Sequence, residues 1–202
     1  MPLIDSWSAP EYLITFTPYF TKMIFEFIPH ESDYLSYLFY VTTKSKRVQK
    51  KRTINKMVIL FIYFISGLYL YNSQGPIPAA LFFILCLPTY FLYNYFEKKQ
   101  YRKHFTRYIG AHFSEEIGVT TTIHLDDEGV TVSVGESETK MPWSEIEEIN
   151  ETGTLILIQE KNQNTIVIPK NTSRVRELAD ELKRFAMEHI IPYQEELNWK
   201  WK

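Results

Sequence analysis

The sequence lacks the residues that most catalytic and metal sites need. It has one cysteine, Cys86, which excludes an intrachain disulfide framework and a zinc site built on several thiolates. Its five histidines are scattered, with no pair four residues apart. No Gly-x-Ser-x-Gly elbow, phosphate-binding glycine loop or Gly-x-Gly-x-x-Gly is present. We therefore expect a protein that is not an enzyme, with no catalytic residue, no cofactor and no metal.

Charge is also missing from two long stretches. Residues 57–71 and residues 77–96 contain no Lys, Arg, Asp or Glu, and the turn between them, residues 72–76, contains a glycine and a proline. So short a turn makes the two runs antiparallel neighbours. The second run is long enough to cross a bilayer core of about 30 Å, whereas the first needs its flanking residues to do so. We predict a two-helix transmembrane hairpin over residues 57–96, kinked at Pro88; the alternative is a buried helical hairpin of a soluble protein.

Basic residues bracket these runs on both sides. Cytoplasmic flanks of membrane helices are enriched in Lys and Arg, so this pattern predicts a multi-pass protein of the cell membrane with two helices and both termini in the cytoplasm. A nucleic-acid partner is not expected, because a basic cluster beside an apolar helix usually sets topology or contacts anionic lipid. The candidate topology residues are Lys44, Lys46, Arg47, Lys50, Lys51, Arg52 and Lys56 before the hairpin and Lys98, Lys99, Arg102 and Lys103 after it.

The segments around the hairpin have weaker patterns. Residues 1–29 predict an arm that ends in a short strand at 23–28, and residues 1–16 show no signal peptide. Residues 30–56 predict an amphipathic and then basic helix, whose aromatic face is suited to lie along lipid headgroups. Residues 97–118 predict a basic helical connector that ends near Gly110 and Gly118. In the tail, residues 191–202, Trp199 and Trp201 either dip into the headgroups or fray.

Residues 119–190 change to a period of two. Val130, Val132 and Val134 alternate on one face, and turns separate five or six short antiparallel strands. One amphipathic helix follows, with a cap expected at residues 171–173 and an end at Pro192. These elements predict a small curved sheet or partly open barrel closed by a C-terminal helix. The whole chain is therefore expected to be an α+β membrane protein.

Three segments of this region carry a family resemblance: His124-Leu-Asp-Asp-Glu-Gly-Val-Thr-Val-Ser133, Met141-Pro-Trp-Ser-Glu-Ile146 and Ile166-Val-Ile-Pro-Lys170. Behind a basic-flanked hairpin, they resemble the YcxB-like bacterial membrane proteins over roughly residues 26–190. The resemblance implies a cytoplasmic domain similar to the bacterial pleckstrin-homology-like (PH-like) folds, to whose sheet the N-terminal strand can add. It offers no catalytic residues, and its motif residues Gly129, Pro142, Trp143 and Pro169 are expected to be structural.

Charge separates the remaining functions. From residue 108 to the end there are 18 acidic and 9 basic residues, so this half of the chain has a charge of about −9. We expect a membrane-anchored interaction module that binds a protein partner through a sheet edge or a helix, with the lipid bilayer as its other partner and homo-oligomerisation left open. The alternatives are an immunity or inhibitor protein against a membrane-acting factor and, disfavoured by the acidic charge, lipid headgroup binding at a basic corner of Lys161, Lys170, Arg174 and Arg176. A membrane-bound enzyme ranks last, because no catalytic constellation supports it.

Overall fold

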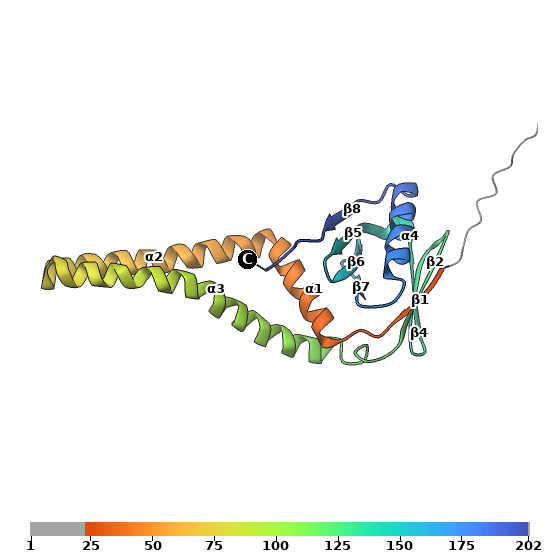
Figure 1. Ribbon diagram of the computed structural model, residues 1–202, viewed down its shortest axis with the longest axis horizontal. Helices are drawn as coiled ribbons and strands as arrows, with labels where there is room; N and C mark the ends of the chain where they lie inside the picture. The colour runs from red at the N-terminus through yellow and green to blue at the C-terminus, as the bar shows by residue number, and fades with distance from the viewer. Residues whose placement is uncertain (1–22, 202) are drawn as a thin grey trace, which may run out of the picture.

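The computed structural model describes residues 23–201, which form a long helical hairpin and a globular part with two four-stranded sheets (Figure 1). The α+β class predicted from the sequence is confirmed. The predicted arm before Met23 and the expected absence of a signal peptide at residues 1–16 lie outside the described residues.

The first sheet is antiparallel, with the order β1-β2-β3-β4. Its strands are β1 (Met23–Phe27), β2 (Thr121–Asp126), β3 (Gly129–Val134) and β4 (Ser137–Pro142). Alternate residues of β1 are buried, as its sequence predicts, and β1 pairs with β2 in a register that joins Met23 to Leu125 and Phe27 to Thr121. The helices are therefore inserted between two neighbouring strands of one sheet, and the expected addition of the N-terminal strand is confirmed.

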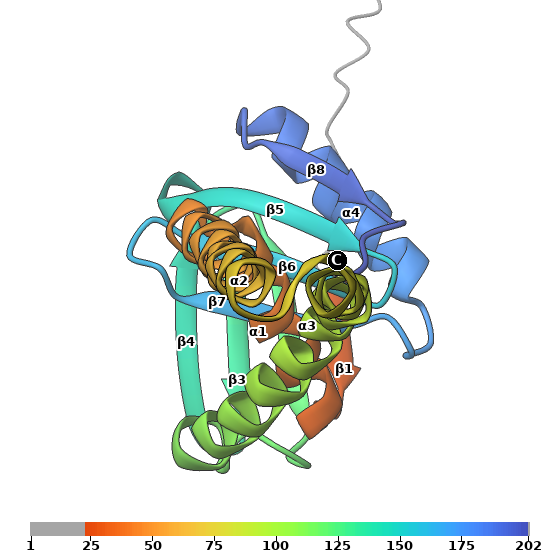
Figure 2. The same cartoon turned by 90° about the vertical axis from the view of Figure 1, so that its left-hand side faces the viewer.

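The second sheet has the order β7-β6-β5-β8. Its strands are β5 (Ile146–Thr152), β6 (Leu155–Glu160), β7 (Thr165–Pro169) and β8 (Tyr193–Glu196), and a short 3-10 helix, η1 (Trp143–Glu145), leads into β5. Strands of the two sheets run across each other, with α4 (Val175–Glu188) against one side (Figure 2). Side chains from both sheets and α4 form one core; its fully buried members include Ile123, Ile149, Ile158, Leu178 and Leu182.

Two details of this part differ from the prediction. The tail is not frayed, because β8 pairs in parallel with β5, a long-range contact with no local sequence signal. The start of α4 is not capped by residues 171–173. Its N-cap is Arg174, whose φ of 65° is left-handed, and no side chain caps the helix.

Three helices connect the two sheets to the hairpin: α1 (Glu31–Lys44), α2 (Lys46–Gln74) and α3 (Pro76–His112). The predicted five-residue turn is wrong, because the two long helices meet at Gly75 alone, at a φ of 92° that favours glycine. The helix expected at residues 30–56 breaks at Ser45, so its basic run begins α2. The connector expected at residues 97–118 is a continuation of α3, and Gly110 lies inside that helix.

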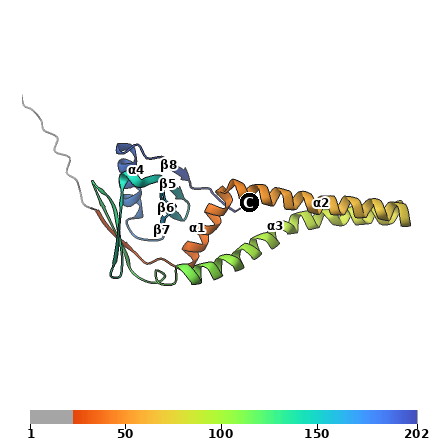
Figure 3. The ribbon, with the colours of Figure 1, turned by 180° about the vertical axis from the view of Figure 1, so that it is seen from behind.

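α2 is long and apolar enough to cross a membrane. α3 bends by 40° between Tyr90 and Leu92, close to Pro88, and meets the same criterion only if its two parts are taken as one span. α2 and α3 lie side by side at their joined ends and diverge toward the sheets, where α1 lies between them (Figures 1 and 3). Gly67 permits close packing of the pair, since a Cβ there would lie 2.3 Å from the ring of Phe83.

The aromatic face of α1 is buried in protein, so the prediction that it lies along lipid headgroups is wrong. Tyr34 and Tyr40 pack with Ile109 of α3 and with Leu155 and Leu157 of β6. Phe39, on the same helix, contacts Phe105 and Trp201, with ring centroids 5.3 and 4.8 Å away. α1 is thus a wedge that fixes the hairpin to the second sheet.

Candidate functional site

A cleft of about 780 Å³ lies between the two sheets, below the ends of α1 and α3. Its walls include Thr139 of β4 and Thr165 of β7, and its floor includes Phe27, Val132 and Met141. The sequence predicts the strands that build this cleft but not the cleft itself, because the cleft forms only where β4, an edge strand of the first sheet, approaches β7, an edge strand of the second.

Both side walls are edge strands. β4 ends the first sheet and β7 ends the second, so neither has a strand partner on its outer side within residues 23–201. The two-residue turn at Gly135 and Glu136 makes Val134 and Ser137 a hydrogen-bonded pair. Alternation along the ladder therefore directs the backbone groups of Glu138 and Lys140 toward the free side. Such an edge is a template for one more strand.

The charged residues around the cleft are almost all acidic. Glu115, Glu116 and Glu160 line it together with His112, and no Lys or Arg of residues 23–201 belongs to its lining. The hydroxyl of Tyr34 donates to Oε2 of Glu116 at 2.6 Å, which fixes one carboxylate at the mouth. Burial and this hydrogen bond to an anion both raise the pKa of Tyr34, so the phenol stays a neutral donor. A site of this charge favours a cationic ligand.

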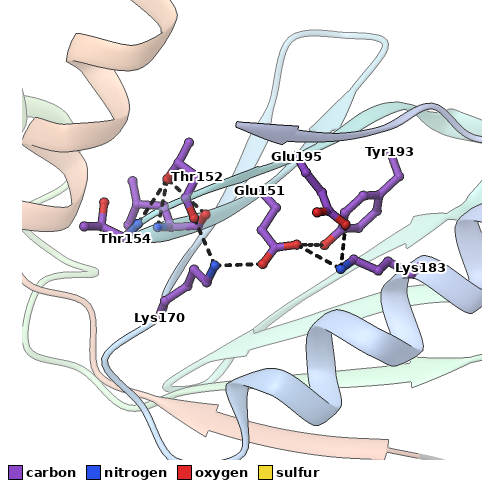
Figure 4. A network of polar contacts seen from close by, with 8 residues as sticks. Glu151, Thr152, Thr154, Lys170, Lys183, Tyr193 and Glu195 are labelled. Carbon is purple, nitrogen blue, oxygen red and sulfur yellow. Dashed lines mark hydrogen bonds and ion pairs between the residues drawn. The ribbon is translucent and has the colours of Figure 1, made fainter. Parts of the chain in front are cut away.

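A second concentrated group of ionisable side chains surrounds Glu151 of β5, which is buried (Figure 4). Lys170 Nζ donates to its Oε1 at 2.7 Å and the hydroxyl of Tyr193 donates to its Oε2 at 2.7 Å. Lys183 Nζ lies 3.4 Å from Oε2 and 2.7 Å from Glu195 Oε1. The network joins β5, the end of β7, α4 and β8.

The pKa shifts in this network indicate that it stabilises the fold. Burial alone would raise the pKa of Glu151, but hydrogen bonds from Lys170 and Tyr193 and the charge of Lys183 outweigh it and lower the pKa. Burial, and then the hydrogen bond to Glu151, raises the pKa of Tyr193. Glu151 lines neither the cleft nor the second pocket described below, and each of its oxygens already has partners.

The family-motif residues lie in the core and at the strand corners. A Cβ on Gly129 would lie 2.2 Å from the backbone oxygen of Met141, so the pairing of Gly129 with Pro142 requires glycine. Trp143 is buried, donates from Nε1 to the backbone oxygen of Asp126 at 2.8 Å, and stacks on Phe185. Pro169 ends β7, an edge strand, where its missing N–H is tolerated.

The basic residues around the hairpin divide into two groups. Lys44 pairs with Glu196, Arg52 pairs with Glu97 at 2.7 Å, and Lys56 lies over the rings of Tyr90 and Tyr93. The others are exposed at the bases of α2 and α3: Lys46, Arg47, Lys50, Lys51, Lys98, Lys99, Arg102 and Lys103. Their effect on topology stays a prediction. Of the basic corner, Lys170 is bound to Glu151 and Arg174 to Glu177.

Residues 125–186 match the family model described as YcxB-like protein. No curated protein and no solved structure shows a significant match to the chain. The matched segment begins in β2, ends in α4 and contains all four motif residues, including the tightly packed Gly129 and the buried Trp143. The resemblance to YcxB-like proteins that the sequence indicates is therefore confirmed for residues 125–186.

Proposed function

We propose that the protein is a non-enzymatic interaction module anchored in a cell membrane by the two-helix hairpin. Its sheets and both termini lie in the cytoplasm, and the cleft between β4 and β7 binds an extended, positively charged segment of a protein partner. The observation that carries this proposal is the cleft itself, whose two walls are free strand edges and whose charged lining is acidic.

The anchor is supported by the surface of the hairpin. Apolar side chains that a protein in water would bury are exposed on both helices, among them Phe61 at 64%, Ile77 at 74% and Leu87 at 64%. The bent α3 counts here as one span beside α2, since both helices run to the same tip at Gly75. The exposed cations sit at the opposite ends of the two helices, on the side of the sheets. This distribution favours a cytoplasmic location for the sheets.

The order of strands supports a PH-like domain. After the helices, a meander of three strands (β2 to β4), a second meander of three (β5 to β7) and α4 follow one another; β1 pairs with β2 at the edge of the first meander, and α4 contributes to the core between the sheets. Such a fold does not by itself say what is bound. The strand edges and the acidic lining support binding. A strand added by the partner forms main-chain hydrogen bonds with β4 or β7, and its Lys and Arg side chains are attracted by the carboxylates of Glu115, Glu116 and Glu160.

Site-directed crosslinking in cells tests the binding site. A photoreactive residue at Thr139 or Thr165, in the cleft walls, should capture one protein, whereas the same residue at Glu147, exposed on β5 and outside the cleft, should not. Glu115→Lys should weaken the Thr139 crosslink several-fold, because it reverses a charge that has no partner within the described residues, and Glu147→Lys should leave it unchanged. Equal capture from all three positions would refute the cleft as the site.

Cysteine labelling tests the orientation. In a Cys86→Ser background, Ser73→Cys beside the tip of the hairpin should react with an impermeant maleimide on intact cells, and Glu136→Cys in the β3–β4 turn should react only after lysis. The reverse pattern would overturn the orientation. Release of the intact chain from vesicles by alkaline carbonate would overturn the membrane anchor.

A further inference from the structure

A second pocket, of about 420 Å³, lies where the tail meets the base of the hairpin. Three cations line it: Lys98 and Arg102 from α3, and Lys200 from the tail. The rest of its lining is neutral and includes Ser36, Thr152, Thr154, Trp199 and Trp201, so within residues 23–201 it has no carboxylate. The pocket thus joins the basic flank of α3 to a cation of the tail.

The fold holds these three cations in one place. Lys98 and Arg102 are four residues apart on α3 and therefore share a face. Lys200 lies between two anchored tryptophans. Trp199 donates from Nε1 to Thr43 Oγ1 at 3.2 Å and packs on Tyr40, while Trp201 packs on Phe39 and Tyr101. The tail passes close over the β5–β6 turn, since a Cβ on Gly153 would lie 2.7 Å from the backbone oxygen of Leu197.

The three cations of the pocket differ from neighbouring cations in their ion pairing. Lys44 and Arg52, near the same junction, each have a carboxylate partner in Glu196 and Glu97. Lys98, Arg102 and Lys200 have no ion pair within residues 23–201 and face one pocket together. The indole N–H of Trp201, a further residue of the lining, is buried and has no hydrogen-bond acceptor among the described residues. Like charges in one pocket repel one another, and an anion relieves that repulsion.

We propose that this pocket binds a phosphate group. A phosphate carries up to two negative charges and accepts several hydrogen bonds, which suits the planar fork of Arg102 with two ammonium groups beside it.

If the hairpin spans the membrane as proposed, the pocket lies at the level of the lipid headgroups. Lys98 and Arg102 follow Phe96, the last apolar residue of the run, by two and six positions. At about 1.5 Å per residue they lie roughly 3 to 9 Å beyond the apolar run. The headgroup layer is about 5 to 7 Å thick on each side, so a lipid phosphate reaches the pocket from the membrane, while a soluble phosphate compound enters from the cytoplasm.

Phosphate binding can be measured on the full chain in neutral detergent. Titration with inorganic phosphate should change the fluorescence of Trp199 and Trp201 and release heat in calorimetry. Arg102→Gln and Lys200→Gln should weaken this binding at least tenfold. The matched controls Lys99→Gln and Lys103→Gln remove the same charge from the same turns of α3 outside the pocket, and should change it less than twofold. Thermal unfolding of each variant shows that it is folded.

A second arm distinguishes the sources of phosphate. Native mass spectrometry of protein extracted from vesicles of phosphatidylglycerol and phosphatidylcholine should show phosphatidylglycerol retained on the wild type and lost from the Arg102→Gln, Lys200→Gln double variant. Phosphate binding without lipid retention assigns the pocket to a soluble phosphate compound and supports the site. No phosphate binding, or equal losses in the control variants, overturns it. If carbonate strips the protein from membranes, the anchor fails while the titration still reports on the pocket.

Discussion

Glu151→Gln should destabilise the protein far more than removal of an ordinary surface charge. Glu151 is only 6% exposed, and its two carboxylate oxygens form ion pairs with Lys170 and Lys183 and accept a hydrogen bond from Tyr193. Glutamine keeps the shape and one acceptor oxygen. Its amide nitrogen, however, must take the place of the oxygen that faces Lys170 or of the oxygen that faces Lys183 and Tyr193, so in either orientation an N–H donor opposes an ammonium group.

The expected cost follows from the burial of the partners. Removing one member of a buried ion pair typically costs about 3–5 kcal/mol, since the remaining charge is left without compensation. Lys170 and Lys183 keep side-chain exposures of 19% and 29%, and Lys183 retains Glu195, so we expect the lower end, about 3 kcal/mol. For a chain of this size each kcal/mol lowers the Tm by roughly 2–4 °C, which gives a fall of about 6–12 °C.

The difference should depend on pH in a definite direction. The pKa of Glu151 is lowered in the folded protein, so the unfolded chain binds the proton more readily. The carboxylate therefore contributes its full stability above the ordinary glutamate pKa and loses it as the pH falls through the lowered value. Wild type and Glu151→Gln should differ most near pH 7 and converge in acid.

The assay is thermal unfolding in mild detergent, followed by intrinsic tryptophan fluorescence, to which the buried Trp143 contributes. Glu147→Gln is the matched control, because it removes one carboxylate from the same strand at an exposed position with no partner among the described residues; its expected effect is within about 0.5 kcal/mol. Equal Tm values for the two variants at pH 7, or a difference that persists unchanged in acid, would show that the network does not stabilise the fold.

Two glycine substitutions test close contacts, with Gly110 of α3, which has nothing within 4 Å, as the control for both. Gly129→Ala should lower the free energy of unfolding by about 1–3 kcal/mol, because the added methyl overlaps the backbone oxygen of Met141; Gly110→Ala should instead stabilise by about 0.5–1 kcal/mol. Gly67→Leu should separate α2 from Phe83 and lower resistance to unfolding by SDS, whereas Gly110→Leu should not. Unchanged unfolding in Gly129→Ala or Gly67→Leu would contradict the respective packing.

Local patterns were sufficient to predict most of the elements. The alternation of Val130, Val132 and Val134 places β3, and the apolar spacing of Leu178, Leu182 and Phe185 places α4. Glycine and proline were less reliable markers of boundaries. Gly110 is inside α3 because an exposed helical glycine costs only about 1 kcal/mol against Ala, which packing of the neighbouring Ile109 outweighs.

Long-range contacts explain what the sequence could not predict. The aromatic face of α1 reads equally well as a membrane-surface helix or a buried one, and only the approach of Leu155 and Leu157 from β6 decides for burial. The cleft likewise depends on two strand edges that are about 30 residues apart in the chain. One local signal of the acidic cleft is present in the sequence, the pair Glu115 and Glu116 directly after a basic helix.

The tail adds a connection between the helical hairpin and the sheets. The chain passes between them through the short segment before α1 and through the segment before β2, which are joined by a hydrogen bond from Gly118 N to the backbone oxygen of Pro29 at 3.0 Å. β8 and the two terminal tryptophans add a third connection, because Trp201 contacts α1 and α3 and its ring lies 4.7 Å from the Arg52 guanidinium of α2. Three separate connections argue against a domain that swings on a flexible linker. Tyr37 of α1 and Tyr108 of α3 line the cleft, so the partner that we propose to bind there is expected to contact the helices that continue into the hairpin.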